Sequence, residues 1–419
     1  MEGILREPGR PRRILFLTTK YPLPGDSYLI GELAEALAAM GHKVDVLHLS
    51  WDAAIGSGDV ERAGPNGMRI VDLAPRAKGR PGSLLYKASK FLLTSRAATK
   101  QLRRHFDVAS YDALVAYTPA LTLAGPLRAA IRAGVRTRIL YVFDFFPIHH
   151  REIGLIPSGL VYAAAKGLEE WLIRSFTTIV CNLPGNIGYL RRNFDLRRDQ
   201  RVVSTPLWTV TAPLSPEPRE AVRKELELPL DRPIAIFGGQ LTQGRGIEQM
   251  LDAAELAEQR GSPLMFLFVG GGRLADDIAA RAGRSSNVRH VPTVQRDRYL
   301  SVVSACDVGM VATVRGVSSF SFPTKTIDYL RAGLPVVAAV EPGSDYTDIL
   351  TGYDVGRSVA FDDAGGYLAA LEALTAPDLD RAALRVRADR ALDEVFDVRH
   401  SARTVLEAIA AEEAKEDNR

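Results

Sequence analysis

The sequence of 419 residues has few cysteines, few tryptophans and no long apolar run. Its two cysteines, Cys181 and Cys306, each follow apolar residues, which favours two buried thiols in a reducing compartment over a disulfide. No apolar stretch approaches the length of a membrane span, and residues 1–13 are basic without the apolar segment of a secretory signal. These absences predict a cytoplasmic protein.

Metal-binding patterns and a strong net charge are also lacking. Cysteine and histidine do not cluster with metal-ligand spacing, and the acid pair Asp378 and Asp380 precedes a helical stretch that it is expected to cap. We therefore expect no metal and no other cofactor. The formal net charge is only +3, so it identifies no partner by itself. The chain is long enough for two domains.

The first half of the chain alternates strands and helices. Strands are predicted at residues 13–17, 43–49, 113–117, 138–143 and 177–181, and helices at 32–40, 120–133 and 160–173. This alternation is typical of a doubly wound parallel sheet. The loop of residues 18–31, which contains Gly25, is long for such a connection, and long loops at the carboxyl end of a sheet commonly bind ligands. An irregular loop without function is the alternative.

The second half repeats the pattern after residues 209–232, which are rich in proline and charge and are interpreted as a linker. A strand at 234–239 leads through a glycine-rich loop into a helix at 247–258, and a strand at 264–269 ends in a triple glycine. Glycine lets a backbone approach a pyrophosphate, and Arg245 in the first loop is placed to clamp it. Arg273, after the triple glycine, is placed to touch phosphate too. A tight structural turn is the alternative interpretation of both loops.

Residues 321–337, with the sequence SFPTKTIDYLRAGLPVV, predict a loop, a short helix, a turn and a buried strand. Pro323 suits the first helical turn, and Thr324 or Thr326 is expected to cap it. Gly333 is expected to end the helix in the left-handed conformation.

Two charged residues of this helix suggest a binding site. Lys325 places a cation in the first turn, which is unfavourable unless an anion offsets it. Asp328, one turn further on, is placed to hold the vicinal hydroxyls of a ribose. An ordinary solvated turn with a surface lysine and aspartate is the alternative.

Residues 76–104 form a strongly basic segment. It contains nine lysines or arginines and no acid: Arg76, Lys78, Arg80, Lys87, Lys90, Arg96, Lys100, Arg103 and Arg104. Apolar residues are interleaved with them, which is typical of a basic amphipathic helix on a membrane surface. Each basic residue near an anionic leaflet contributes roughly 1 kcal/mol. We expect an anionic membrane surface as a partner and no nucleic acid, although a packing helix with a solvated basic face or a nucleic-acid patch is the rival interpretation.

PTKTIDYLRAGLPVV resembles the nucleotide-sugar-binding block of family 4 glycosyltransferases, nearest the branch with P-[ST]-K-x-x-[ED]-Y-x-x-A-G-x-P-V. The run from Asp144 to Pro147 is similar to the Asp-Leu-Trp-Pro motif of that branch, and residues 168–171 (LEEW) to its L-E-x-W stretch. Residues 238–246 resemble the family's G-x-x-x-x-x-K-G turn, with Arg245 at the lysine position. The chain departs from the family at Phe320, where the wider family has a glutamate, and at Phe143, where many relatives have a histidine.

The resemblance implies the GT-B fold, an α/β architecture of two doubly wound Rossmann-like domains that face each other across a cleft. Residues 1–208 would bind the acceptor and 233–398 the nucleotide sugar, with 209–232 as the linker and a helix at 399–419 that returns to the first domain. The implied activity is retaining, metal-independent transfer of a sugar from a nucleoside diphosphate sugar, with a UDP-sugar as the expected donor, to an acceptor hydroxyl.

The resemblance also carries roles to residues of this chain. Asp144, Arg245 and Lys325 would be catalytic. The donor would contact Gly239, Gly244, Arg245, Gly246, Gly271, Arg273, Pro323, Thr324, Lys325 and Asp328. Gly25, Asp144, His149 and His150 would lie on the acceptor side.

The membrane expectation favours a lipid-linked saccharide in envelope, exopolysaccharide or glycolipid assembly, and a peripheral location on the inner face of the membrane. A soluble hydroxyl acceptor is the fallback. Two other functions fit the same architecture: a nucleotide-sugar epimerase, and a catalytically silent protein that binds a nucleotide sugar. A dinucleotide-dependent oxidoreductase is disfavoured because residues 18–31 lack G-x-G-x-x-G.

Overall fold

The computed structural model of the protein describes residues 10–21, 29–51, 53–55, 57–80, 83–118, 120–152, 154, 156, 159–211, 214–315, 322–340 and 344–417. The chain divides into two compact units. Unit 1 consists of Met1–Pro206 and Val398–Arg419, and unit 2 of Leu207–Asp397. Each unit is an α/β domain with one mainly parallel sheet, in agreement with the predicted fold class.

Unit 1 contains a sheet with the strand order β3-β4-β2-β1-β5-β6-β7-β8. The strands are β1 (Arg13–Thr18), β2 (Lys43–Leu49), β3 (Val60–Ala63), β4 (Arg69–Leu73), β5 (Ala113–Tyr117), β6 (Thr137–Val142), β7 (Thr178–Cys181) and β8 (Arg201–Ser204). All neighbours pair in parallel except β3 and β4. The central strands β1, from Ile14 to Leu17, and β5 consist of buried apolar residues because helices cover both of their faces.

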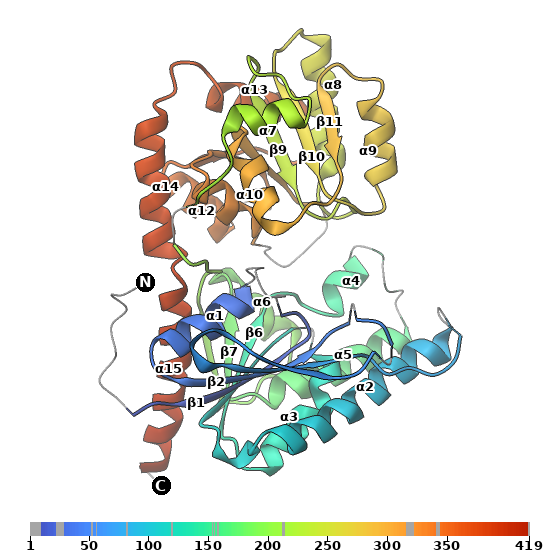
Figure 1. The fold of residues 1–419 in the computed structure, drawn as a ribbon, viewed down its shortest axis with the longest axis vertical. Coiled ribbons are helices and arrows are strands. Elements are labelled where there is room, and N and C mark those ends of the chain that lie inside the picture. Colours follow the sequence, from blue (N-terminus) through green and yellow to red (C-terminus); the bar gives the residue numbers. More distant parts are fainter. Residues whose placement is uncertain are drawn as a thin grey trace. The chain divides into compact units, whose positions relative to one another are not determined.

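Helices cover both faces of this sheet (Figure 1). One face carries α2 (Leu84–His105), α3 (Ala124–Arg132) and α5 (Leu160–Arg174), and the other α1 (Leu29–Ala39) and α15 (Val398–Asp417). Two shorter helices, α4 (Ile148–Glu152) and α6 (Gly185–Asn193), follow the strands β6 and β7. The C-terminal helix α15 packs on α1 and β6 and is therefore part of unit 1.

Unit 2 contains a parallel sheet with the order β11-β10-β9-β12-β13-β14. Its strands are β9 (Ile234–Gly238), β10 (Met265–Val269), β11 (Val288–Val291), β12 (Val308–Ala312), β13 (Val336–Ala339) and β14 (Gly356–Ser358). The winding reverses between β9 and β12, and ligands of open α/β sheets bind at the carboxyl ends of the strands where such a reversal occurs.

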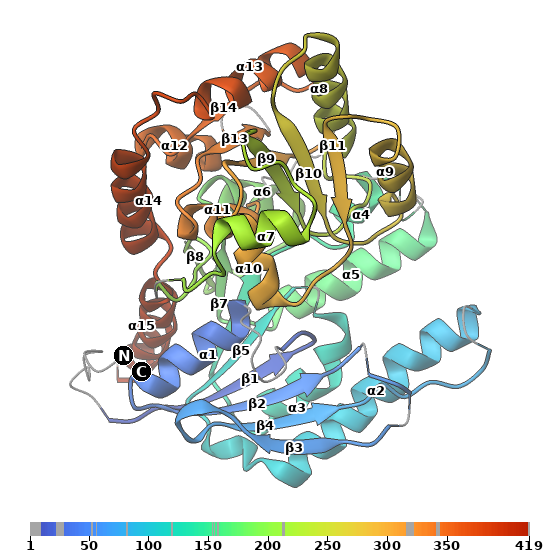
Figure 2. The same cartoon turned by 45° about the horizontal axis from the view of Figure 1, so that its top comes forward.

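The helices of unit 2 also form two layers (Figure 2). One layer contains α8 (Ile247–Gln259), α9 (Ala275–Ala282) and α13 (Ala364–Leu374). The other contains α7 (Arg219–Glu225), α10 (Arg296–Ser304), α11 (Lys325–Arg331), α12 (Asp345–Gly352) and α14 (Arg381–Val395).

Residues 209–232, expected to be a linker, contain helix α7, which packs on α10 inside unit 2. This helix was not predicted because the segment is rich in proline and charge, and one of the two residues that α7 buries, Val222 and Arg223, is itself charged. The guanidinium of Arg223 is almost fully buried and donates to Asp307 Oδ2 (2.7 Å) and to the carbonyl of Ala305 (2.9 Å). This segment therefore belongs to the core of unit 2.

The strands β3 and β4 were also not predicted. They form an antiparallel hairpin whose turn contains Asn66 and Gly67 with positive φ angles of 53° and 77°. Positive φ angles at two successive turn residues favour the dipeptide Asn-Gly, and residues 66–67 of the sequence could therefore have indicated a hairpin here. In contrast, the two cysteines are buried and free, as predicted.

Candidate active site

The predicted phosphate loops lie at the carboxyl edge of the unit 2 sheet, after β9 and β10. They are held against each other by the backbone: Gly239 N–H donates to the carbonyl of Val269 (2.9 Å) and Leu241 N–H to that of Gly271 (2.9 Å). A Cβ on Gly270 would lie 1.9 Å from the carbonyl oxygen of Gly239. The close approach of two backbones therefore requires glycine here, in addition to any contact with a ligand.

Gly246 ends the first loop and is the N-cap of α8 in the left-handed conformation, with φ of 58°. A Cβ at this position would lie 2.4 Å from the Cβ of Ala312, at the end of β12. The loop is consequently pressed against the neighbouring strand. The side chain of Arg245, the residue just before Gly246, is exposed.

Lys325 lies at the start of α11 with its ammonium nitrogen 3.9 Å from the centre of the Phe237 ring. Among the described residues no carboxylate forms an ion pair with it. Burial, together with a smaller effect from the positive charge of Arg245, lowers the pKa of Lys325 to about 7. Two basic side chains thus lie close enough to repel each other without a described counter-charge, and a bound anion would favour the charged form of both.

The first turn of α11 differs in detail from the prediction. Thr324 is the N-cap but its side chain forms no capping bond, because its φ and ψ of −53° and −30° are helical rather than extended. Thr326 does not cap either, since its hydroxyl lies 2.7 Å from Tyr346 Oη in the interior. Pro323 lies before the N-cap Thr324 and therefore outside the first turn in which it was expected, whereas Gly333 has φ of 72° after the end of the helix, as predicted.

Asp328, the predicted ribose ligand, is mostly buried and paired. Its two carboxylate oxygens accept bonds from the guanidinium of Arg296, at 2.7 and 2.5 Å. Arg296 had not been singled out from the sequence. Ribose hydroxyls would have to use the remaining lone pairs of Asp328 or replace the guanidinium, so its role as a ribose ligand stays a prediction.

Two buried tyrosines support the end of β9 from below. Tyr329 Oη accepts a bond from Gly238 N–H (3.2 Å), and a Cβ on Gly238 would lie 2.1 Å from Tyr299 Oη. Sequence reasoning missed this support because it depends on rings from α10 and α11 that lie far from the loop in the chain. The side chain of Arg273 is exposed, and its predicted phosphate contact also stays a prediction.

The acceptor-side residues lie in unit 1, after β6. Thr118, after β5, accepts bonds at its hydroxyl from the N–H groups of Phe143 and Asp144 (3.0 Å each) and donates to the carbonyl of Asp144 (2.8 Å). His150 Nδ1 lies 3.6 Å from Asp144 Oδ2. The structure therefore brings Asp144 and His150 together. Gly25 and Phe320 lie outside the described residues.

His149 does not share this contact. The rings of His149 and His150 are almost perpendicular, with centroids 6.2 Å apart. The Nδ1 atoms of both are buried without a hydrogen bond to a described residue, and only that of His150 lies within ion-pair distance of Asp144. Adjacent residues of a helix point in different directions, so only His150 faces the aspartate.

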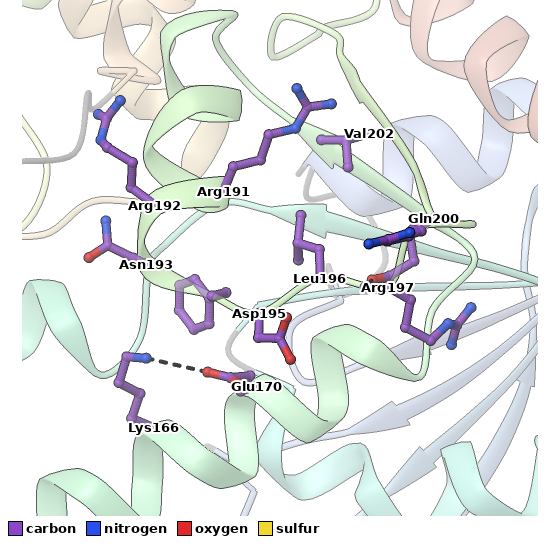
Figure 3. Close-up of a pocket in the computed structure, with 12 residues that line it drawn as sticks. Lys166, Glu170, Arg191, Arg192, Asn193, Asp195, Leu196, Arg197, Gln200 and Val202 are labelled. Carbon is purple, nitrogen blue, oxygen red and sulfur yellow. Dashed lines mark hydrogen bonds and ion pairs between the residues drawn. The ribbon is translucent and has the colours of Figure 1, made fainter.

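A separate cavity of about 680 Å³ lies in unit 1 between α5 and the segment after α6. It is lined by basic residues, among them Lys166, Arg191 and Arg192. In Figure 3 the two arginines extend away from the Lys166–Glu170 pair, which is closed at 3.3 Å. Because the cations do not converge on one point, this cavity does not resemble an anion site.

Comparisons with known proteins agree with this geometry. Residues 27–208 match the family described as glycosyl transferase 4-like domain, and residues 232–376 match glycosyl transferases group 1. The chain is 23% identical over 348 residues to WcaI of Escherichia coli (strain K12), a glycosyl transferase named for colanic acid biosynthesis; the match covers 78% of this chain and 82% of WcaI.

Two solved structures share the fold. HepE of Anabaena, in complex with UDP and glucose, is 14% identical with a TM-score of 0.67, and the superposition covers 95% of this chain and 99% of the HepE chain. WaaG, a glycosyltransferase involved in lipopolysaccharide biosynthesis, has a TM-score of 0.63 at 15% identity and covers 94% and 99%. Together with the two family matches, which span most of both units, these likenesses identify the chain as a GT-B glycosyltransferase of the family 4 type.

Proposed function

We propose that this glycosyltransferase moves a sugar from a nucleoside diphosphate sugar, with a UDP-sugar as the expected donor, to an acceptor hydroxyl in envelope polysaccharide or glycolipid assembly. The observation that carries the proposal is the pair of cations at the carboxyl edge of unit 2, where Lys325 lies over Phe237 beside Arg245 without a described carboxylate partner. The envelope pathway follows from the names of WcaI and WaaG.

The proposed chemistry is electrostatic. Charge builds on the departing diphosphate in an oxocarbenium-like transition state, and Lys325 and Arg245 stabilise it as a metal ion does in other enzymes. A partly buried cation stabilises this charge more strongly than a solvated one, since water screens it less. We propose retention at the anomeric carbon and assign no covalent nucleophile, no metal and no other cofactor.

The glycine loops would complete the donor site. In this proposal the backbone at Gly239, Gly244, Gly246 and Gly271 approaches the diphosphate together with Arg273, Pro323 and Thr324. On the acceptor side, Asp144 would accept a hydrogen bond from the acceptor hydroxyl, with His150 beside it at 3.6 Å. His149 and Gly25 remain proposed neighbours of the acceptor.

The test is acceptor-dependent release of a nucleoside diphosphate. The purified protein is incubated with a panel of nucleotide sugars and with lipid-linked or soluble saccharides in the presence of a chelator. We expect one sugar nucleotide to be consumed only when an acceptor is present, with the product bond in the donor's anomeric configuration by NMR. Conversion of the sugar without an acceptor would favour an epimerase, and binding without turnover would favour the silent binding protein.

We also propose that unit 1 docks on an anionic membrane. Helix α2 buries Thr94, Ala98 and Leu102 but exposes Phe91 and Leu92, by 47% and 62%. Lys90 Nζ lies 4.6 Å from the ring centre of Trp51, which also contacts Phe91. Helices that lie on a membrane surface combine basic residues with exposed apolar ones. The exposure of Phe91 and Leu92 therefore supports contact with a membrane rather than a helix face that is only solvated.

Helix α5 adds a second apolar surface to unit 1. Its residues Leu160 and Val161 are exposed by 89% and 73%, and Leu168 lies two turns further along the same exposed side. No helix among the described residues is long and apolar enough to cross a membrane. The proposed contact is therefore with the membrane surface.

Co-sedimentation with vesicles tests this contact. We expect binding to vesicles with anionic lipid, weakened by salt, and at least about a tenfold loss in the double variant Phe91→Ser/Leu92→Ser, because two apolar side chains no longer enter the lipid. Val386→Ser, at an exposed apolar residue of unit 2, is the matched control. Equal binding of both variants would contradict the docking surface.

A further inference from the structure

Glu169 is a buried carboxyl group with no hydrogen-bond partner among the residues that the structure describes. Helix α5 places it on the inward face with Leu172 and Ile173, where only 1% of the residue is exposed. The neighbouring Glu170 points outward and pairs with Lys166 at 3.3 Å. Two adjacent glutamates thus occupy opposite environments on one helix, which makes Glu170 a natural control.

Neither carboxyl oxygen of Glu169 forms a hydrogen bond with a described residue. Burial, together with a smaller effect from the negative charge of Asp144, raises the pKa of Glu169 to about 8. The nearby backbone N–H of Ala120 acts in the opposite direction without forming a full hydrogen bond. No described basic side chain offsets this carboxyl group, so it carries its proton at neutral pH.

The surroundings of Glu169 are the loops of the proposed acceptor site. Ala120 follows β5 and Asp144 follows β6, and these neighbouring parallel strands end at the same edge of the sheet. Thr118 ties the two loops together through its three bonds to Phe143 and Asp144. Glu169 therefore lies in the interior of unit 1, near Ala120 and close enough to Asp144 to be affected by its negative charge.

We propose that Glu169 is a positioning residue for Asp144: as a neutral acid it packs beside the Asp144 loop without placing a second negative charge there, and its ionisation displaces Asp144 from His150. This inference rests on the proposed role of Asp144 at the acceptor. Two carboxylates that share a site cannot both ionise without a cost, and Asp144, which is partly exposed, is the one that water can solvate.

The titratable groups around this site lie on three elements. Asp144 stands on the connection after β6, His149 and His150 on α4, and Lys166 and Glu170 on the outer side of α5. The charged group that acts on Glu169 is Asp144. A change in the Glu169 proton should therefore be transmitted to the acceptor step first.

The test compares wild type with Glu169→Gln, which keeps the shape but cannot ionise. At saturating donor, kcat/KM for the acceptor should fall about tenfold in the wild type between pH 7 and pH 9. These values lie one unit below and one unit above a pKa of about 8, so the protonated fraction of Glu169 falls by that factor. Glu169→Gln should stay within about twofold of wild type at pH 7 and lose most of this decline. Glu170→Gln should retain it. An unchanged decline in Glu169→Gln would overturn the proposal.

A second measurement does not depend on turnover. Because the folded protein holds a proton on Glu169 that the unfolded chain releases above its ordinary pKa of 4.5, stability falls as the pH rises from there through about 8. The gain in Tm of Glu169→Gln over wild type should be larger at pH 9 than at pH 6. A gain independent of pH would overturn the proposal. If this gain follows the expected course but no acceptor reacts, the proposed transferase role of Asp144 fails instead.

Discussion

The two edges of the unit 2 sheet differ in whether their charged side chains have partners of opposite charge. At the amino edge, Asp307 precedes β12 and receives bonds from Arg219 and Arg223 (2.7 Å each) and from the backbone N–H of Ile234 (2.9 Å). At the carboxyl edge, Lys325 has an aromatic ring and a second cation as neighbours and no described carboxylate. The charges at the amino edge are therefore balanced by partners of opposite sign, whereas Lys325 at the carboxyl edge has no such partner among the described residues.

This difference separates a structural cluster from a binding site. A buried ion pair with all its hydrogen bonds made fastens α7 to the sheet, and removing one partner leaves an uncompensated charge. A cation whose pKa is depressed by burial destabilises the empty protein and is favourable only with an anion. Perturbed groups of the second kind gather at functional sites.

The largest expected effect is on turnover. Lys325→Ala should lower kcat by at least about 100-fold, because it removes a cation that acts on the charge of the departing diphosphate. The melting temperature should stay the same or rise. Lys224→Ala, which changes an exposed lysine of α7, is the matched control. A wild-type kcat in Lys325→Ala would contradict the proposal that the carboxyl edge is a binding site in which Lys325 stabilises the departing diphosphate.

The next effect is on stability alone. Asp307→Ala should lower the free energy of unfolding of unit 2 by about 3–5 kcal/mol, because it leaves the buried Arg223 without its carboxylate. Asp389→Ala, which breaks an exposed pair with Arg385 on α14, should change it by less than about 1 kcal/mol. Denaturant unfolding measures both values. If both variants lost a similar free energy of unfolding, the buried pair of Asp307 and Arg223 would stabilise unit 2 no more than an exposed ion pair does.

The smallest effect is the pH dependence of the empty site. The pKa of Lys325 is about 7 in the folded protein and 10.5 in the unfolded chain, so the unfolded chain binds more protons between these values and stability rises with pH. Without ligand, Lys325→Met should therefore raise Tm more at pH 6 than at pH 9. The opposite order would mean that Lys325 is not held in a depressed state.

Much of the fold followed from the pattern of apolar strands and glycine turns. Strand β5 was predicted with the observed bounds, and the end of α11 at Gly333 with its positive φ. These features depend on neighbouring residues in the chain. Helix α7 and the hairpin of β3 and β4 were missed, since a buried arginine and a short Asn-Gly turn carry weaker signals than an apolar run.

The site was predicted less completely. The sequence indicated Arg245, Lys325 and Asp144, but not that Phe237 would lie under Lys325 or that Arg296 would pair with Asp328. These contacts join different strands and helices of the sheet, and no local pattern encodes them. Residues 168–171 had been matched only as a motif; the packing of α5 under the β5 and β6 loops makes Glu169 a candidate positioning residue.

The most direct measurement is calorimetric titration of the protein with UDP at pH 8 in buffers of different ionisation enthalpy. With a pKa of about 7, Lys325 is mostly neutral in the empty protein, and a bound diphosphate restores its charge. We predict uptake of roughly 0.9 proton per UDP in the wild type and close to none in Lys325→Met. Tight binding with no proton uptake, or equal uptake in both proteins, would contradict the assignment of the diphosphate to Lys325.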